Sequence, residues 1–195
     1  MASFMISAEP QLRHNSFNAK TIDAAITLVD VTCSNRIGFR GQQVATFLQA
    51  QGLDIPQQPN RAVVMNNGLI ILSLSQTEFW LLDIDNQHRQ LMIELETLAD
   101  ITKQVTRLYT QHSQAMFIIN GDDCPQMFAK VCAVNLHPDA FESGVIAQTS
   151  VARVSSVVVN VTHNEQPTRF IILSDISSAQ YLWQAIEDAA AEFQL

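Results

Sequence analysis

The chain has 195 residues, of which 47% are hydrophobic, and this is enough apolar sequence to bury a substantial core. Its 11 basic and 19 acidic residues give a net charge of −8, so phosphate backbones and anionic lipid surfaces would be repelled, which excludes nucleic acid and membranes as expected partners. The opening residues lack the basic region and apolar run of a signal peptide, no stretch approaches the ~18 apolar residues of a membrane span, and three scattered cysteines form no disulfide framework. We therefore expect a cytoplasmic protein.

Residues 1–20 predict an N-terminal arm with little periodicity, which contains Pro10, Asn15 and Asn18. We expect it to be ordered only where a partner or the rest of the chain holds it. Residues 21–195 are predicted to form one domain.

The first half of that domain predicts a mixture of strands and helices. Apolar residues alternate or cluster in 24–31 and 35–41, as in half-buried strands. A short amphipathic helix is predicted between Gly41 and Gly52, with Val44, Phe47 and Leu48 on its apolar face. Residues 61–65 and 69–74 are predicted to form a hairpin through Asn66-Asn67-Gly68.

A further strand is predicted at 79–84, followed by a helix. Asp85 and Asn86 are suitable N-cap residues for that helix, and Leu91, Leu95 and Leu98 would lie on one of its faces.

The second half of the chain repeats this pattern. The segment FWLLDIDNQHRQLMIELE, which starts at Phe79, aligns without a gap with FIILSDISSAQYLWQAIE, which starts at Phe170. Ser177 then stands opposite Asn86, with Gln180 placed for a capping box. Upstream, Gly41 aligns with Gly121, and the second copy is eleven residues longer, which we assign to the loop after its first helix.

The predicted fold class is therefore α+β, with internally duplicated βαβ-type units and mostly antiparallel strands. Repeat one covers about residues 30–100 and repeat two about residues 110–193.

The segment CAVNLHPDAFE, from Cys132 to Glu142, suggests a metal site or an activated thiol because it combines a cysteine, His137 and carboxylates. Cys124 and Cys132 are eight residues apart on one predicted helix, which is a rise of about 12 Å, so they cannot share one ion. No CxxC or HxxxH spacing supports a site built from Cys132, His137, Asp139 and Glu142. A buried Cys132 and a turn anchored by Phe141 are the preferred interpretation.

Other candidate sites are weaker. Gly38 and Gly41 before a helix form no phosphate-binding motif, and a role in the strand-to-helix turn is favoured for Gly41 and for Gly121. Asp83, Asp85 and Glu94 mimic a calcium loop, but His88 replaces its essential glycine. The remaining expectations concern exposure: His14, His88, His112 and His163 should face solvent, whereas Trp80, Trp183 and Tyr181 should pack against the sheet. We assign no catalytic, cofactor-binding or metal-binding residues.

Several segments resemble, in order and spacing, the gamma subunit of heterotetrameric sarcosine oxidase, from about residue 30 to the C-terminus. They are RIGFRGQQVATFLQAQGLDIPQQPN, LSQTEFWLL, CAVNLHPDAFESGVIAQTSVA and RFIILSDISSAQYLWQAIEDAAAEF. The chain departs from the family pattern at Asn135, where an acidic residue is frequent. This puts in doubt any charged contact from that loop.

The resemblance implies a fold similar to the folate-binding domain of the glycine-cleavage aminomethyltransferase. It also implies an accessory, noncatalytic subunit that forms a hetero-oligomer with the alpha-type subunit, in a complex that demethylates sarcosine to glycine. FAD, FMN, NAD and tetrahydrofolate would be carried by the other subunits, with no cofactor on this chain.

Two alternatives remain open. The first is a free-standing folate-binding or one-carbon transfer protein, in which a buried acid and an aromatic side chain would hold a pterin; Asp30, Asp83 or Asp100 with Phe79 or Trp80 are the candidates. The second is a self-associating structural protein.

Overall fold

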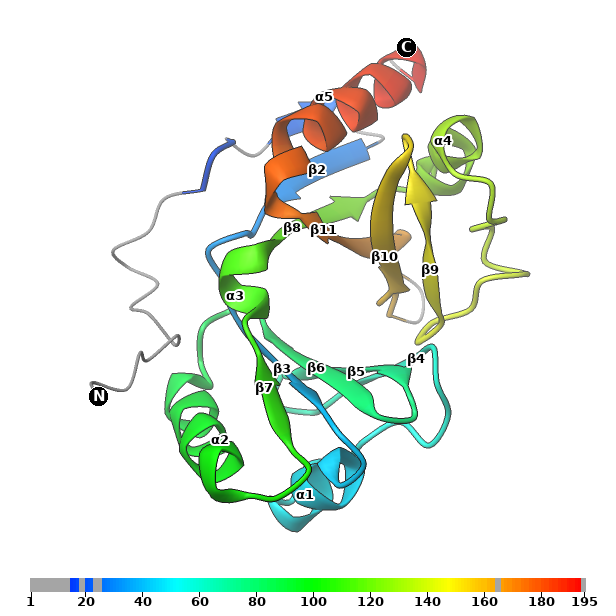
Figure 1. Cartoon of the computed structure of the whole chain (residues 1–195). Helices are drawn as coiled ribbons and strands as arrows, with labels where there is room; N and C mark the ends of the chain where they lie inside the picture. Colours follow the sequence, from blue (N-terminus) through cyan, green and yellow to red (C-terminus); the bar gives the residue numbers. More distant parts are fainter. Residues whose placement is uncertain (1–14, 18–19, 23–25, 164–165, 194–195) are drawn as a thin grey trace. The chain divides into compact units, whose positions relative to one another are not determined.

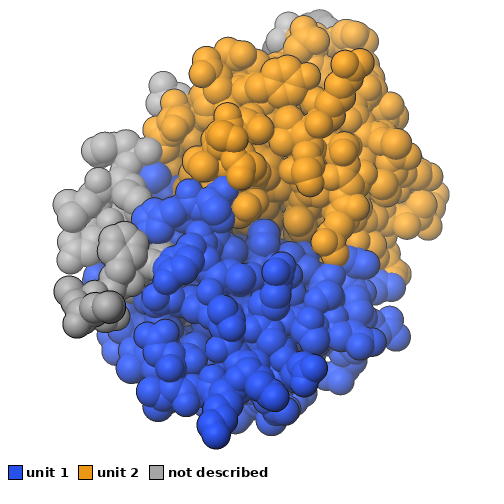
Figure 2. Space-filling view, viewed as in Figure 1, with its two compact units in different colours: residues 1–14, 33–113 blue, residues 15–32, 114–195 orange. Residues whose placement is uncertain are grey.

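The computed structural model describes residues 15–17, 20–22, 26–163 and 166–193. The chain divides into two compact units (Figure 2), and each is described by itself. Unit 1 contains Cys33–Ser113, and unit 2 contains the described parts of Asn15–Thr32 and Gln114–Leu195. From residue 15 onwards, the described chain therefore starts in unit 2, forms unit 1, and then completes unit 2.

Unit 1 is a sheet of five described strands, and the two longer of its described helices cover one face (Figure 1). All neighbouring strands are antiparallel, and the order is β4 (Arg61–Val64), β5 (Ile70–Ser75), β6 (Glu78–Asp83), β3 (Asn35–Arg40) and β7 (Thr106–Leu108). The helices are α1 (Val44–Ala50), α2 (Arg89–Ile101) and α3 (Thr110–Ser113).

The core of unit 1 lies where α1 and α2 pack against one face of this sheet. Val44, Phe47 and Leu48 of α1 are buried there, as predicted, beside Ile37, Phe39, Ile71, Phe79 and Leu81 of the strands. On α2 the buried apolar residues are Met92, Leu95 and Ala99, and Leu91 and Leu98 are only partly buried. The predicted apolar face of this helix was therefore rotated slightly from the real one.

Unit 2 is a sheet of six described strands, again with antiparallel neighbours and helices on one face. The order is β1 (Lys20–Ile22), β2 (Ile26–Asp30), β8 (Gln114–Asn120), β11 (Arg169–Asp175), β10 (Val154–Asn160) and β9 (Ile146–Val151). The helices are α4 (Cys124–Val131), the 3-10 turn η2 (Ile176–Ser178), α5 (Ala179–Ala190) and the 3-10 turn η3 (Ala191–Phe193).

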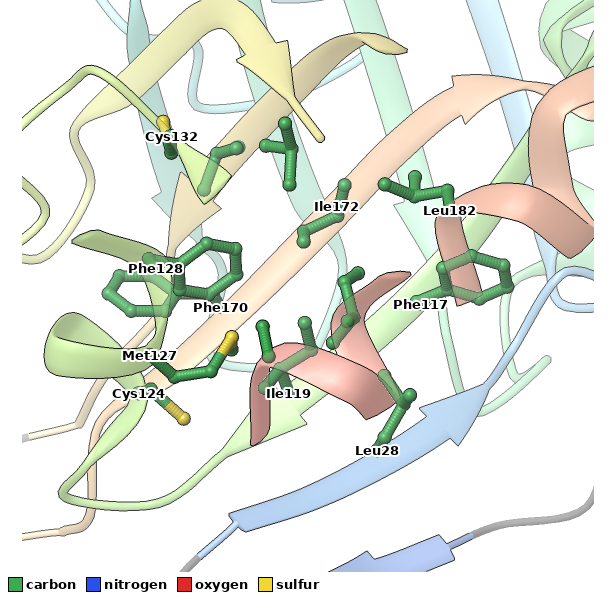
Figure 3. Packing of buried hydrophobic residues seen from close by; sticks show 14 of the residues in the cluster. Leu28, Phe117, Ile119, Cys124, Met127, Phe128, Cys132, Phe170, Ile172 and Leu182 are labelled. Carbon is green, nitrogen blue, oxygen red and sulfur yellow. The ribbon is translucent and has the colours of Figure 1, made fainter. Parts of the chain in front are cut away.

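The core of unit 2 is richer in aromatic residues. Figure 3 shows Phe128 of α4 beside Phe170 of β11, and their rings meet edge-on with centroids 5.5 Å apart. Leu182 and Ile186 of α5 complete this cluster, and both are fully buried. Full burial of such side chains contributes about 1.5–3 kcal/mol each, so this layer fixes both helices on the sheet.

The two sheets have matching strand orders. In unit 1 the order is β4-β5-β6-β3-β7, and in unit 2 the sequence β9-β10-β11-β8-β2 repeats it, with β1 added outside β2. The strand just before β3 in the chain lies in the sheet of unit 2, and the strand just before β8 lies in the sheet of unit 1. The same order would result if two copies of one strand-and-helix unit had exchanged their first strands.

Gly41 and Gly121 occupy equivalent strand-to-helix turns, as predicted. Their φ angles are 146° and 143°, in the region that favours glycine. The N–H of Gly41 donates to the Thr77 carbonyl and that of Gly121 to the Thr168 carbonyl, both at 2.9 Å. These turns direct α1 and α4 back across their sheets.

The sequence alignment places all of the additional residues of the second half in the loop after α4. This assignment is wrong, because part of them lie elsewhere. Val63 pairs with Ile71, eight residues away, whereas the corresponding pair Ala147 and Val158 is eleven residues apart. The next hairpin is also longer, because Ile71 pairs with Leu81 and Val158 pairs with Ile172. Most of the additional residues therefore lie in two hairpin connections, where sheet pairing tolerates insertions.

The predicted helix caps were wrong in detail. Asn86 has a φ of 56° and its side-chain oxygen accepts a hydrogen bond from the N–H of Asn35, while Asp83 accepts from the N–H groups that precede α2. Ser177 lies within η2 and donates to Asp175, so the capping box with Gln180 does not form. In both cases an aspartate at or near the end of a strand performs the capping function.

Most of the predicted arm lies outside the described residues. Within residues 15–17, the main-chain N–H groups of Ser16 and Phe17 both donate to the carboxylate of Asp30, at 2.9 and 3.2 Å. The ring of Phe17 stacks on that of Trp183. This part of the segment is therefore packed on unit 2. Among the described helices, none is both long and apolar enough to cross a membrane.

Candidate functional site

The loop from Cys132 to Glu142 is built as a structural connection. Cys132 is buried and forms an antiparallel bridge with Val151. The carbonyl of His137 accepts hydrogen bonds from the N–H groups of Ala140 and Phe141, and the Phe141 side chain is buried. This confirms the predicted turn with an aromatic anchor.

Asn160 holds the same loop from the neighbouring strand β10. Its side-chain amide donates to the Phe141 carbonyl at 2.6 Å, and its main-chain N–H donates to the Val145 carbonyl. His137 and Asp139 are exposed on the outside of the turn, with Nδ1 and Oδ2 3.4 Å apart. The loop thus brings its polar residues to the solvent rather than to Cys132.

The cysteines of unit 2 lack the surroundings of reactive thiols. Burial, followed by the negative charges of Asp122 and Asp123, raises the pKa of Cys124 from 9.0 to about 12. At neutral pH this thiol is protonated and enclosed by the apolar cluster around Met127 (Figure 3). In the described part of the chain, no three His, Cys, Asp or Glu side chains lie close enough together to hold a metal ion.

A buried acid-imidazole pair lies at the start of α2, and sequence reasoning missed it. The carboxylate of Asp83, 2% exposed, accepts hydrogen bonds from the N–H groups of Gln87 and His88 and from the side chain of Asn35. Nδ1 of His88 lies 3.1 Å from Asp83 Oδ1, and the His88 side chain is only 15% exposed. The expectation that His88 faces solvent was wrong; that expectation holds for His112 and His163, and His14 is outside the described residues.

The Asp83 cluster is better suited to structure than to proton transfer. Each carboxylate oxygen already accepts two hydrogen bonds. These bonds hold the N-terminus of α2 and offset part of the free-energy cost of burying the carboxylate. The sequence signal is an aspartate at the end of a strand, six residues before the first residue of the helix.

Arg36 is a second buried polar residue of unit 1. Its guanidinium donates to the main-chain carbonyls of Ser34, Thr110 and Gln111, at 3.0 to 3.2 Å. The Gln111 side chain accepts from the Arg36 N–H at 2.8 Å and donates to the Ser34 carbonyl. These bonds tie α3 to the beginning of β3, so this charge maintains the fold.

The residues considered for pterin binding do not provide such a site. Asp30 accepts three main-chain N–H groups, Asp83 is occupied as described above, and Asp100 is exposed on α2. Phe79 is buried in the core of unit 1, and Trp80 donates its indole N–H to Glu78 at 3.0 Å. Asp30 and Asp83 are engaged by this chain's own groups, Asp100 lies on the helix surface, and the two rings are buried.

The other aromatic predictions have mixed outcomes. Trp80 and Trp183 are buried, as expected. Tyr181 is 55% exposed, so the prediction that it packs against the sheet was wrong. It lies on the outer side of α5, whereas Leu182 and Trp183 take the inner positions.

An open groove lies beside the edge strand β4 of unit 1. Its volume is about 320 Å³, near the lower end of the roughly 300–1,000 Å³ of small-molecule sites. The lining residues are Asp54, Val63, Val64, Met65, Asn66 and Asn67. It contains one carboxylate and neither a histidine nor a nucleophile, so its composition favours binding over catalysis.

These features define an α+β protein with two antiparallel, helix-backed sheets of matching strand order. No protein-family model matches the sequence, and no curated protein sequence does either. Solved structures with the same fold do exist. The chain is similar to a chain of heterotetrameric sarcosine oxidase from Corynebacterium sp. U-96, solved in complex with pyrrole 2-carboxylate, with a TM-score of 0.75 and 21% identity over 91% of this chain and 89% of that chain.

The fold is also shared with a glycine cleavage system protein. Aminomethyltransferase T from Bartonella henselae matches with a TM-score of 0.58 and 18% identity over 85% of this chain. The match covers 46% of the aminomethyltransferase chain, so this chain corresponds to less than half of that enzyme. The fold expected from the family resemblance is therefore confirmed.

Proposed function

We propose that this chain is an accessory, noncatalytic gamma-type subunit of a heterotetrameric sarcosine-oxidase-like complex. The complex would oxidatively demethylate sarcosine to glycine and transfer the one-carbon unit to tetrahydrofolate. The observation that carries the proposal is the end-to-end likeness to a sarcosine oxidase chain, which covers 91% of this chain and 89% of the other. A likeness of this extent matches a whole subunit rather than a shared domain of a larger enzyme.

The chemistry of the described residues supports an accessory role. The Cys124 thiol is protonated and buried, and the carboxylates of Asp30 and Asp83 are occupied by hydrogen bonds within the chain. The redox cofactors FAD, FMN and NAD, together with tetrahydrofolate, would then belong to the other subunits. The alpha-type subunit is the proposed direct partner, and the cytoplasm is the proposed location.

An internal duplication is part of the proposal. It is supported by the matching strand orders of the two sheets and by the equivalent turns at Gly41 and Gly121. Two related units that exchange their first strands would form one inseparable subunit, because each sheet would need a strand from the other repeat.

Co-purification tests the proposed function. A C-terminally tagged chain, expressed from its own locus and isolated under native conditions, should retain larger subunits whose spectrum shows flavin absorbance near 450 nm. The eluate should oxidise sarcosine, while the chain purified alone should not. Recovery of the chain alone, together with flavin subunits that assemble and turn over without it, would exclude this role.

A folate-binding protein that acts alone is the second candidate, favoured only by the likeness to the aminomethyltransferase. A reduced folate at 100 times its dissociation constant should stabilise such a protein by about 2.7 kcal/mol. We expect no thermal shift with tetrahydrofolate, because the candidate carboxylates are already occupied. A saturable shift would favour this second function.

A further inference from the structure

The edge strand β4 of unit 1 has main-chain groups to which no described residue bonds. Among the described strands, its one neighbour in the sheet is β5. The N–H of Met65 donates to the Leu69 carbonyl at 2.8 Å. Because hydrogen-bonded and non-hydrogen-bonded pairs alternate along an antiparallel hairpin, the main-chain groups of Val63 also point towards β5. The N–H and C=O groups of Ala62 and Val64 therefore point away from the sheet, and no other described segment bonds to them.

The groove beside this edge lies next to the core of unit 1. Asp54 lies on the segment before β4, and the flanking side chains of Leu53 and Ile55 are buried in the core of unit 1. Met65 packs against the same core, and Val64 is 43% exposed. The groove thus combines an apolar contact, an exposed carboxylate and a strand edge to which no described segment bonds.

The corresponding edge of unit 2 is bridged at one end by the chain itself. β9 is the edge strand there, and Cys132 forms an antiparallel bridge with its last residue, Val151. The N–H of Ala152 donates to the Val131 carbonyl at 2.7 Å. In unit 1 no described segment bridges β4 in this way. The unit 2 edge shows that the main chain of another segment can bond to one end of this edge strand.

The charges favour a basic segment of another protein over a second copy of this chain. Asp54 is exposed and pairs with no described cation. Two copies that met at this edge would each present the acidic Asp54 side of the groove on a chain with a net charge of −8. Like charges at a contact oppose association, whereas a cationic side chain opposite Asp54 favours it.

We propose that the β4 edge binds an extended strand of the larger partner subunit. The main chain of that strand pairs with Ala62 and Val64, one of its basic side chains faces Asp54, and one of its apolar side chains covers Val64. This is recognition by strand addition, in which main-chain hydrogen bonds supply affinity and side-chain pockets supply specificity. The inference rests on the proposed function, because it names the surface by which the subunit docks.

The test compares variants in the native co-purification. Val64→Pro removes the outward N–H without removing a bond of the hairpin, and proline is tolerated at strand edges. Val64→Thr is the matched control, because it keeps both the N–H and the branched shape. We expect Val64→Pro to retain at least tenfold less flavin subunit than the wild type, and Val64→Thr to retain as much. Asp54→Lys should also reduce retention at least tenfold.

A second measurement does not depend on a variant folding correctly. In hydrogen-deuterium exchange, peptides that contain Ala62 and Val64 should exchange at least tenfold more slowly in the complex than in the isolated chain. Unchanged exchange of this edge would overturn the inference, even if Val64→Pro proved unstable.

The outcomes separate the two proposals. If the wild type retains flavin subunits and Val64→Pro retains them equally, the docking surface is wrong and the proposed function stands. If the wild type retains none, the proposed function fails, and this inference fails with it. A homodimer of the isolated chain that Val64→Pro abolishes would assign the edge to a second copy and overturn the proposed occupant.

Discussion

The aromatic ring of Phe17 stacks on the ring of Trp183, with centroids 4.7 Å apart and planes at 11°. Phe17 also meets Phe117 edge-on at 6.1 Å, and its main-chain N–H donates to Asp30. This contact anchors the residues that precede β1 to α5 and the sheet of unit 2.

Replacement of Phe17 by alanine should destabilise the protein by about 2 kcal/mol, because it removes a partly buried ring and its stacking energy. Urea denaturation followed by near-ultraviolet circular dichroism measures both the loss of stability and the changed environment of Trp183. Phe17→Leu is the control and should recover part of the loss. An alanine variant within about 0.5 kcal/mol of the wild type would show that the anchor contributes little.

Gly41→Ala should be more damaging than its small size suggests. A Cβ atom at this position would lie 1.9 Å from the main-chain oxygen of Gln104, and the φ of 146° is itself unfavourable for alanine. We expect a loss of more than about 3 kcal/mol from the combined strain and displacement.

Gly52→Ala is the matched control for this substitution, because Gly52 also has a positive φ, of 76°, but has open space around it. It should cost about 1–2 kcal/mol. Equal losses for the two variants in urea denaturation would contradict the close approach of Gln104 to Gly41.

The thiol of Cys124 should make stability depend on pH in the alkaline range. Burial raises its pKa from 9.0 to about 12, so the unfolded chain loses this proton at a lower pH than the native chain. The stabilisation is fully present below pH 9 and decreases as the pH rises from 9 towards 12, at up to about 1.4 kcal/mol per pH unit.

The check is to compare the wild type with Cys124→Ala between pH 8 and 11. The free energy of unfolding should fall less steeply in the variant, whatever its absolute loss from the cavity it creates. In the native wild type, alkylation mapped by mass spectrometry should modify the partly exposed Cys33 long before Cys124. Identical slopes and rapid labelling of Cys124 would disprove its enclosure.

Asp83→Asn should destabilise unit 1 by about 1–3 kcal/mol. The amide cannot accept all four hydrogen bonds that the carboxylate accepts, and its NH₂ group would face one main-chain N–H donor, that of Gln87 in place of Oδ1 or that of His88 in place of Oδ2. Asp85→Asn, at an exposed position two residues away, should change stability by less than about 0.5 kcal/mol. Thermal unfolding of both variants measures the contrast; indistinguishable melting temperatures would remove the capping role of Asp83.

Local patterns predicted the elements that depend on neighbouring residues. The helix between Gly41 and Gly52, the hairpin at Gly68 and the buried anchor Phe141 follow from turn chemistry and apolar spacing. The capping roles of Asp83 and Asp175 could not be predicted in this way, because both residues precede the positions where an N-cap is usually sought.

Features that depend on pairing between distant strands could not be predicted. Nothing in the sequence around His88 shows that Asp83 faces its imidazole, and nothing around β2 shows that it pairs with β8 rather than with β3. The distribution of the additional residues over two hairpins and the loop after α4 also required the register, since the different offsets of the two aligned segments led us to place all of them in one loop.

Native mass spectrometry of the tagged chain isolated from its own host tests the central claim most directly. The subunit role predicts that the 21.7 kDa chain is found at one copy per assembly with larger flavin-bearing chains, and that its mass alone carries no bound cofactor. A spectrum that contains only the chain itself, as a monomer or as a homo-oligomer, would contradict the account.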